Sequence, residues 1–210
     1  MAPAAPVPPE IVGKKEMGSR LRAERKARKM TLQALSRASG IAVSTISKAE
    51  LGQIALSYEK FASLARALDI DMTRLFILGD APQAAVPPTF LKSTLVEAHD
   101  YVTENYHYRL LLGEYPGKKM LPMLAIIDSR SVDEFEDYIR HPGQEFVMVL
   151  SGKVRIQFEN GENVVLQRFE SAYFDSSIGH VYLSLSKTPA QVLAVCTDLD
   201  EVPERRRKNH

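Results

Sequence analysis

The chain has 210 residues, of which 45% are hydrophobic and 25% charged, a balance typical of a globular protein and not of a disordered or fibrous one. No apolar run approaches the roughly 20 residues that span a bilayer, and the Pro- and Ala-rich start lacks the pattern of a signal peptide. We therefore expect a cytoplasmic protein without a membrane segment. Its net charge of +1 conceals an asymmetry, because residues 10–80 carry 13 Lys and Arg against 8 Asp and Glu, whereas residues 81–204 carry 10 against 18. A basic first part suits a polyanion, and an acidic second part predicts a different partner.

A helical domain is predicted over residues 14–78, after a disordered tail at residues 1–13. The basic helix EMGSRLRAERKARK comes first. Thr31 is a good N-cap for the helix LQALSRAS, which ends at Gly40, and Ser57 is expected to cap the helix SYEKFASLARAL. A short helix, DMTRLF, completes the domain.

The stretch TLQALSRASGIAVSTISKAELG, residues 31–52, contains two helices joined by a tight glycine turn. With RLRAERKARK before it and FASLARALDI after it, this stretch resembles the phage-repressor type of helix-turn-helix found in the XRE family, over about residues 18–76. The resemblance implies that the second helix, starting near Val43, enters the major groove of a DNA operator. The chain departs from the family pattern at two positions. Ala42 stands where family members often have a capping Ser, which weakens the cap of the second helix. Leu51 stands where a basic residue is common, which removes one phosphate contact.

The physical pattern of this stretch indicates the same interface. Short hydroxyl and long basic side chains at the start of the second helix suit base edges and phosphates, while Ile46 and Ala49 face the other helices. One such helix reads only a few base pairs, so we expect a homodimer on a palindromic operator. Further cations of the first helix, Arg25, Lys26, Arg28 and Lys29, are expected to add affinity for any sequence. The predicted DNA-binding residues are Val43, Ser44, Thr45, Ser47, Lys48, Gln33, Arg20 and Arg22.

The second half of the chain changes to a period of two. Residues 79–95 hold several prolines and are predicted to be a linker. Over residues 96–202, short segments rich in Val, Ile, Leu, Phe and Tyr alternate with turns such as PGKK and NGEN, which predicts an all-β sandwich or barrel. SRSVDEFEDYIR is the exception, a helical turn or charged loop. Cys196, the only cysteine, lies in the apolar run QVLAVC and is expected to be a buried hydrophobic side chain. The basic tail, residues 203–210, is expected to be solvated.

Two stretches of this β region, RHPGQEFVMVLSG and YFDSSIGHVYL, resemble the two motifs of the cupin family, over about residues 98–198. His141 and Glu145 match the first motif and His180 matches the second. The resemblance implies an α + β two-domain chain: an all-α helix-turn-helix head joined to an all-β cupin barrel, the double-stranded β-helix or jelly roll. It also implies a divalent metal at these three side chains, and two histidines with one carboxylate suit Fe, although Zn, Mn or Ni also fit.

The spacing of these residues leaves alternatives open. On a regular strand His141 and Glu145 face the same way, and Tyr182 shares the parity of His180, so all four are candidate effector-binding residues. Against a metal, Ile139 stands where the motif has its first histidine, and Phe169 replaces a turn glycine. His141 could instead hydrogen-bond Glu145, and His180 could be a satisfied interior histidine.

The leading hypothesis is a sequence-specific transcriptional regulator without enzymatic activity, whose cupin domain senses a small metabolite directly or through a metal. The alternative is a mononuclear iron oxygenase or epoxidase, because some cupin epoxidases carry a repressor-like head and a similar H-x-G-x-E frame. Arg109 and Arg140 are then weak candidates for substrate binding. A third hypothesis is a regulator whose barrel only dimerises.

Overall fold

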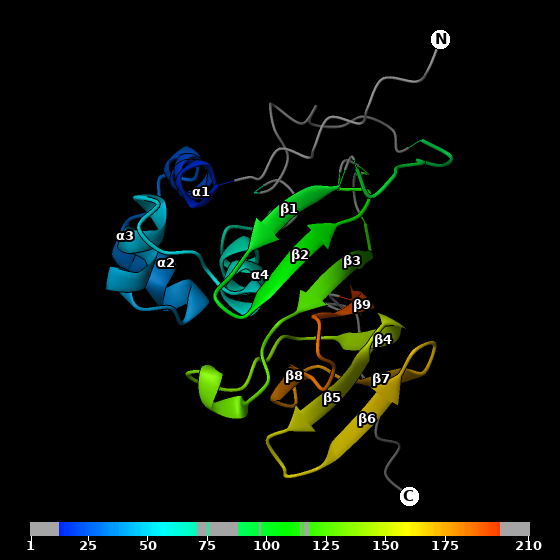
Figure 1. Cartoon of the computed structure of the whole chain (residues 1–210). Coiled ribbons are helices and arrows are strands. Elements are labelled where there is room, and N and C mark those ends of the chain that lie inside the picture. The colour runs from blue at the N-terminus through cyan, green and yellow to red at the C-terminus, as the bar shows by residue number, and fades with distance from the viewer. Residues whose placement is uncertain are drawn as a thin grey trace, which may run out of the picture.

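A computed structural model describes residues 13–70, 75, 88–96, 98–113, 115 and 118–197. It shows a helical head followed by a β-rich domain, which confirms the predicted α + β two-domain fold (Figure 1). Nearly all of the two predicted tails, about half of the predicted linker and, apart from Leu75, the short helix DMTRLF lie outside the described residues. Within the described part of the chain, no helix has the length and apolarity needed to cross a membrane.

Four helices form the described part of the head. Thr31 caps the second one, because its side chain accepts a hydrogen bond from the Ala34 N–H at 3.0 Å, and Gly40 ends this helix in the left-handed conformation with φ 74°. Both positions confirm the sequence prediction. Ser57 is the N-cap residue of the fourth helix, as predicted, but its hydroxyl donates to the Glu59 carboxylate and makes no capping bond. The helices are α1 (Lys14–Ala27), α2 (Leu32–Ser39), α3 (Val43–Glu50) and α4 (Tyr58–Ala67).

The helices of the head pack round one apolar core. Helix α1 lies on α3, and α2 contacts both α3 and α4. A side chain at Gly18 of α1 would place its Cβ 2.1 Å from the Ala49 carbonyl oxygen of α3, so glycine permits the close approach of these two helices. The core contains the fully buried Leu21, Leu35, Ile46, Phe61 and Leu64.

Two antiparallel sheets form the second domain. The larger sheet has the strand order β1-β2-β3-β9-β4-β7 and the smaller one β6-β5-β8. The stretch SRSVDEFEDYIR contains the 3-10 turn η2 (Val132–Glu134), as predicted, with Ser131 and Glu134 forming a capping box. The strands are β1 (His99–Val102), β2 (Tyr106–Leu110), β3 (Met120–Ile127), β4 (Gln144–Ser151), β5 (Lys153–Phe158), β6 (Asn163–Gln167), β7 (Ser171–Asp175), β8 (His180–Ser184) and β9 (Ala190–Thr197).

The strand register determines which side chains meet inside the sandwich. Glu145 of β4 lies opposite Cys196 of β9 on one side and opposite Phe174 of β7 on the other. In the smaller sheet, His180 of β8 pairs with Phe158 of β5. Farther along β4 and β5 the interior is apolar. Every second side chain of these strands points inward, and Val147, Val149, Val154 and Ile156 are completely buried.

The turn at Phe169 keeps a glycine-like backbone without glycine. Phe169 has φ 68°, in the left-handed region that non-glycine residues adopt at a cost of about 1–2 kcal/mol. Its N–H donates to the Val149 carbonyl at 2.7 Å, and its exposed ring lies 4.3 Å from the Arg168 guanidinium. The turn therefore retains its geometry although the motif residue has changed.

Candidate functional site

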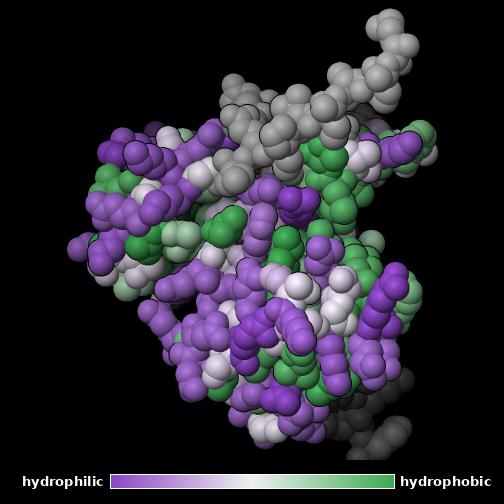
Figure 2. Space-filling model, viewed as in Figure 1, coloured by the Kyte–Doolittle hydropathy of each residue, from purple (hydrophilic) through white to green (hydrophobic). Residues whose placement is uncertain are grey.

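The first candidate site is the outer face of α3. The helix begins at Val43, as predicted, and Ala42 before it makes no side-chain capping bond. Figure 2 shows a largely hydrophilic outer surface on the helical head. Ile46 and Ala49 are buried, as expected, and Leu51 is 55% exposed. Of the predicted DNA-binding residues on α3, Val43, Ser44 and Lys48 are exposed and Thr45 and Ser47 are half-buried.

The predicted DNA contacts outside α3 divide into two kinds. Gln33 and Arg22 are exposed on α2 and α1. Arg20 is only half-buried, but its guanidinium bonds the Glu16 carboxylate at 2.6 Å and the Leu75 carbonyl at 3.2 Å. The first two therefore present a side chain to a ligand, while Arg20 also holds the head together.

Arg25 contradicts the expectation of a phosphate contact. It is buried, and its guanidinium meets Glu50 in two hydrogen bonds of 2.5 and 2.8 Å. A third bond of 2.8 Å reaches the Met30 carbonyl, and the bond to Glu50 is the largest of the effects that raise the pKa of Arg25. The two-pronged contact ties α1 to the last residue of α3, so Arg25 positions the recognition helix.

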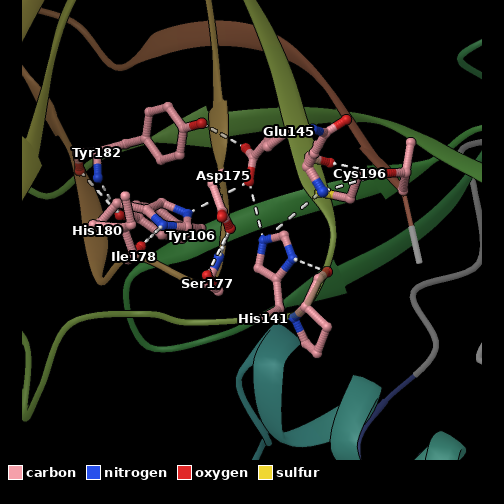
Figure 3. Close-up of polar contacts among 12 residues, drawn as sticks. Tyr106, His141, Glu145, Asp175, Ser177, Ile178, His180, Tyr182 and Cys196 are labelled. Carbon is pink, nitrogen blue, oxygen red and sulfur yellow. Dashed lines mark hydrogen bonds and ion pairs between the residues drawn. The ribbon is translucent and has the colours of Figure 1, made fainter. Parts of the chain in front are cut away.

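The second candidate site is a buried polar cluster round Glu145 (Figure 3). One carboxylate oxygen lies 3.0 Å from His141 Nε2 and 3.4 Å from His180 Nε2. The other accepts a hydrogen bond from the Tyr182 hydroxyl at 2.5 Å. All four side chains are buried, with at most 6% exposed. The structure therefore brings together the four side chains predicted to bind an effector.

His141 reaches the cluster by a different route from the one predicted. It does not lie on a regular strand with Glu145, because β4 begins only at Gln144. The intervening Gly143 has φ 96°, and a Cβ there would lie 1.8 Å from the Thr197 carbonyl oxygen. The His141 N–H donates to the Ser176 carbonyl at 3.0 Å. This tight bend brings the imidazole to the carboxylate.

The outer nitrogens of both imidazoles face backbone carbonyls. His180 Nδ1 lies 2.9 Å from the Ile178 carbonyl, and His141 Nδ1 lies 3.4 Å from the Pro142 carbonyl. A carbonyl at Nδ1 fixes the orientation of the imidazole ring so that Nε2 faces the cluster, which is how metal-ligating histidines are commonly oriented. Both Nε2 atoms point to Glu145.

Cys196 lies beside the cluster, a position that the sequence pattern did not indicate. It is buried, as predicted, and its Sγ also lies 4.0 Å from His141 Nε2. One donor atom each of His141, Glu145 and Cys196 lie within 4.8 Å of one another, whereas His180 stands outside this set of three. The signal that could have found Cys196 is its place opposite Glu145, which only the strand register reveals.

The donor set fits a divalent ion. A tetrahedral Zn²⁺ site has bonds of about 2.0–2.3 Å to nitrogen, oxygen and sulfur, and three donors within 4.8 Å of one another are close enough to share one ion. Burial by itself would raise the pKa of Glu145, but hydrogen bonds and charges from His141 and His180 hold that pKa well below its usual value. Burial, followed by the Glu145 charge, raises the pKa of the Cys196 thiol. The cluster thus contains an ionised carboxylate at Glu145 and a thiol at Cys196, and the thiol must lose its proton before it can bind an ion.

The surroundings of the cluster fix it in place. The Tyr106 hydroxyl accepts a hydrogen bond from the Tyr182 N–H at 2.7 Å and lies 3.1 Å from the Tyr182 carbonyl. Ile139, at the position of the missing motif histidine, forms an antiparallel bridge with His180. The two arginines considered for substrate binding are already ion-paired, Arg109 with Asp100 and Arg140 with Asp137 and Glu159.

A cavity of about 380 Å³ opens beside the cluster, between the head and the β domain. The segment before α4, the β1–β2 turn and residues 134–140 line it, and Tyr108 and Ile139 belong to its wall. The cavity has room for a metabolite-sized molecule, and its wall includes Tyr106 and Ile139, which contact Tyr182 and His180 of the cluster.

Comparisons with known proteins identify both parts of the chain. Residues 21–75 match the helix-turn-helix family and residues 133–196 match the cupin domain family. A HTH_3 family transcriptional regulator from Vibrio cholerae is similar in structure, with a TM-score of 0.60 and 16% identity over 88% of this chain and 96% of that one. Hydroxypropylphosphonic acid epoxidase from S. wedmorenis has a TM-score of 0.47 and 19% identity over 89% of this chain and 100% of that one. Curated protein sequences give no match.

Proposed function

This chain joins an XRE-type helix-turn-helix domain to a C-terminal cupin domain, and we propose that it is a cytoplasmic transcriptional regulator whose cupin cluster senses a small polar effector, directly or through a divalent metal. The observation that carries the sensing role is the convergence of two imidazoles, a thiol and a phenol on the buried Glu145 carboxylate. Burying such groups is costly, and apolar side chains would pack the barrel equally well. A binding role accounts for the cluster better than a packing role does.

At the DNA end, the N-terminal residues of α3 enter the major groove. Ser44, Thr45, Ser47 and Lys48 contact base edges and nearby phosphates, with Val43 against the bases. Arg20, Arg22 and Gln33 hold the DNA backbone. A homodimer places two such helices about 34 Å apart, which matches a palindromic operator.

At the cupin end, His141, Glu145 and Cys196 would hold a metal, with His180 as a neighbour on the opposite sheet. A bound divalent ion would supply an electrophilic centre that recognises an oxygen or nitrogen donor of the effector. The thiolate shifts the preference within Fe, Zn, Mn and Ni away from Mn, which favours oxygen ligands. Tyr182 orients the Glu145 carboxylate.

Selection of DNA tests the first half of the proposal. The full-length chain is incubated with a random-sequence pool of duplexes, and we expect enrichment of one palindromic site. Lys48→Glu removes this binding, whereas the matched exposed control Lys153→Glu on β5 retains it. A pool that stays random after repeated rounds contradicts the DNA-binding role.

Ligand-induced stabilisation tests the second half. A ligand at 100 times its Kd adds about 2.7 kcal/mol of stability, so a panel of metal ions and polar metabolites is screened by thermal unfolding. We expect a stabilising hit that Glu145→Gln abolishes. A panel without any hit supports the hypothesis that the barrel only dimerises.

The second candidate function is an iron oxygenase or epoxidase. It is favoured by one observation, the two Nε2 atoms that converge on one carboxylate, since two histidines and a carboxylate hold Fe(II) in oxygenases. Anaerobic titration with Fe(II) decides it. The absence of stoichiometric Fe(II) binding removes the enzyme hypothesis, and regulation by another ligand is unaffected.

A further inference from the structure

The DNA-binding head contributes a residue to the wall of the cupin cluster. Tyr58 is the first residue of α4, and its ring packs edge-on against the His141 imidazole, with ring centroids 5.0 Å apart and an interplanar angle of 79°. Figure 3 shows a helix of the head directly below His141. Burial, the Cys196 side chain and the Glu145 charge raise the pKa of the Tyr58 phenol. Tyr58 thus touches the site from outside the cupin domain.

Other contacts hold this end of the head on the cupin domain. The Tyr101 hydroxyl of β1 donates to the Leu56 carbonyl, just before α4. Phe61, one turn after Tyr58, packs edge-on against the Tyr101 ring with centroids 5.1 Å apart. Tyr108 of β2 lies 6.4 Å from Tyr58, again between ring centroids. Two aromatic contacts and one hydrogen bond therefore seat the start of α4 over β1 and β2.

The same helix is built into the core that supports the recognition helix. Phe61 and Leu64 of α4 belong to the apolar core that contains Leu35 of α2 and Ile46 of α3. Close-packed interiors transmit a displacement because they contain few voids to absorb it. A shift of the first turn of α4 is therefore expected to reach α3 through α2, which contacts both helices.

From these contacts we propose that Tyr58 is the residue through which the cupin cluster and the DNA-binding head sense each other. Groups that bind at the cluster reposition the His141 ring and the Cys196 thiol, against which Tyr58 packs, and so change the seating of α4. The coupling is reciprocal, so DNA bound to α3 changes the affinity of the cluster for its ligand by the same factor and is expected to change how often the cluster opens. This inference rests on the proposed regulatory function and names Tyr58 as the contact that links the effector site to the DNA-binding helix.

The chain offers a built-in probe for this coupling, because Cys196 is its only cysteine and is 4% exposed. The rate at which a thiol reagent labels Cys196 in the full-length protein reports how often the cluster opens. The rate is measured for the protein alone, with the duplex enriched from the random pool, and with Co²⁺. We expect the bound duplex to change the labelling rate about fivefold or more, the lower end of ordinary coupling.

Variants assign the effect to Tyr58. In Tyr58→Ala, labelling becomes faster and loses its dependence on DNA, while the variant still binds the duplex. Tyr58→Phe keeps the ring on His141, removes the hydroxyl and retains most of the DNA dependence. If the alanine variant does not fold, Tyr58→Leu, which removes the ring but keeps an apolar side chain, takes its place and is expected to lose the DNA dependence. Tyr173→Ala, at an exposed tyrosine of β7, is the matched control and behaves as wild type.

Three outcomes overturn the inference. One is wild-type protein whose Cys196 labels at the same rate with and without bound duplex. Another is Tyr58→Ala that responds to DNA as wild type does. Both leave the proposed function standing. A wild-type chain that enriches no duplex at all overturns the proposed function, and this inference falls with it.

Discussion

The head and the cupin domain hold their functional side chains in opposite ways. In the head, the residues that we assign to DNA lie on the outer face of α3, and a buried ion pair behind that helix fixes its position. In the cupin domain, the functional groups are themselves buried and hold one another, with Glu145 as the common acceptor.

In the head, the side chains assigned to binding are not the ones that stabilise the fold, whereas in the cupin domain the same side chains do both. An exposed contact residue on α3 can change without disturbing the head, since surface substitutions usually alter stability by less than about 0.5 kcal/mol. A change at Glu145 removes the partner of three other buried groups at once. The comparison therefore predicts which substitutions affect binding alone and which affect folding as well.

The largest effect is expected at Glu145. Glu145→Ala leaves His141, His180 and Tyr182 without their shared acceptor, and removal of one partner of a buried pair costs about 3–5 kcal/mol. The free energy of unfolding, measured with denaturant, falls by this amount, and Co²⁺ no longer perturbs the protein spectrum. Glu162→Ala, at an exposed carboxylate, is the control and leaves both unchanged. A loss below about 1 kcal/mol would show that the cluster does not support the fold.

A smaller loss of stability is expected at Arg25. Arg25→Lys keeps the charge but not the two-pronged contact with Glu50, and hydrogen bonds to charged groups contribute about 1.5–3 kcal/mol. Unfolding of the full chain and DNA affinity are both measured, and both fall. Arg22→Lys makes the same change at an exposed position of the same helix and leaves stability at the wild-type value. Equal stability of the two variants would refute the positioning role of Arg25.

Selectivity for DNA is the expected effect at Ser44. The side chain is exposed at the N-terminus of α3, so Ser44→Ala removes a base-edge contact and no core contact. We expect a loss of about 1–3 kcal/mol in discrimination at one base-pair position, with thermal stability unchanged. Binding to single-position variants of the enriched duplex measures it. Uniform weakening at every position would place Ser44 on the DNA backbone instead.

The smallest effect is expected at Arg22, which we assign to a phosphate. Arg22→Ala weakens binding equally for matched and mismatched duplexes and lowers the slope of log affinity against log salt by about 0.9. Titrations at several salt concentrations measure the slope. A change in sequence preference would contradict a pure phosphate contact.

Local signals made the head predictable from the sequence. The capping Thr31, the left-handed Gly40 and the start of α3 at Val43 each depend on a few neighbouring residues, and the structure confirms all three. Arg25 was misassigned because its burial depends on the packing of α1 against α3, which no local pattern shows.

The cupin cluster was predictable only in part. Motif positions identified His141, Glu145 and His180, although the argument from regular strand spacing was wrong for His141, which lies in a bend before β4. Cys196 depends on the register between β4 and β9, and Tyr58 depends on how the head is seated on the cupin domain. Both are contacts between residues far apart in the chain, so the sequence pattern contains no direct signal for either.

The ion pair between Arg25 and Glu50 also bears on how the protein searches DNA. Because it fixes α3 against α1 before any ligand arrives, the ordering entropy of the recognition helix is spent during folding and not during binding. The head therefore meets each DNA site as a rigid surface. Correct and incorrect DNA sites then differ in the contacts that they make with the head and not in the ordering of the head. Discrimination between them is therefore expected mainly in the dissociation rate.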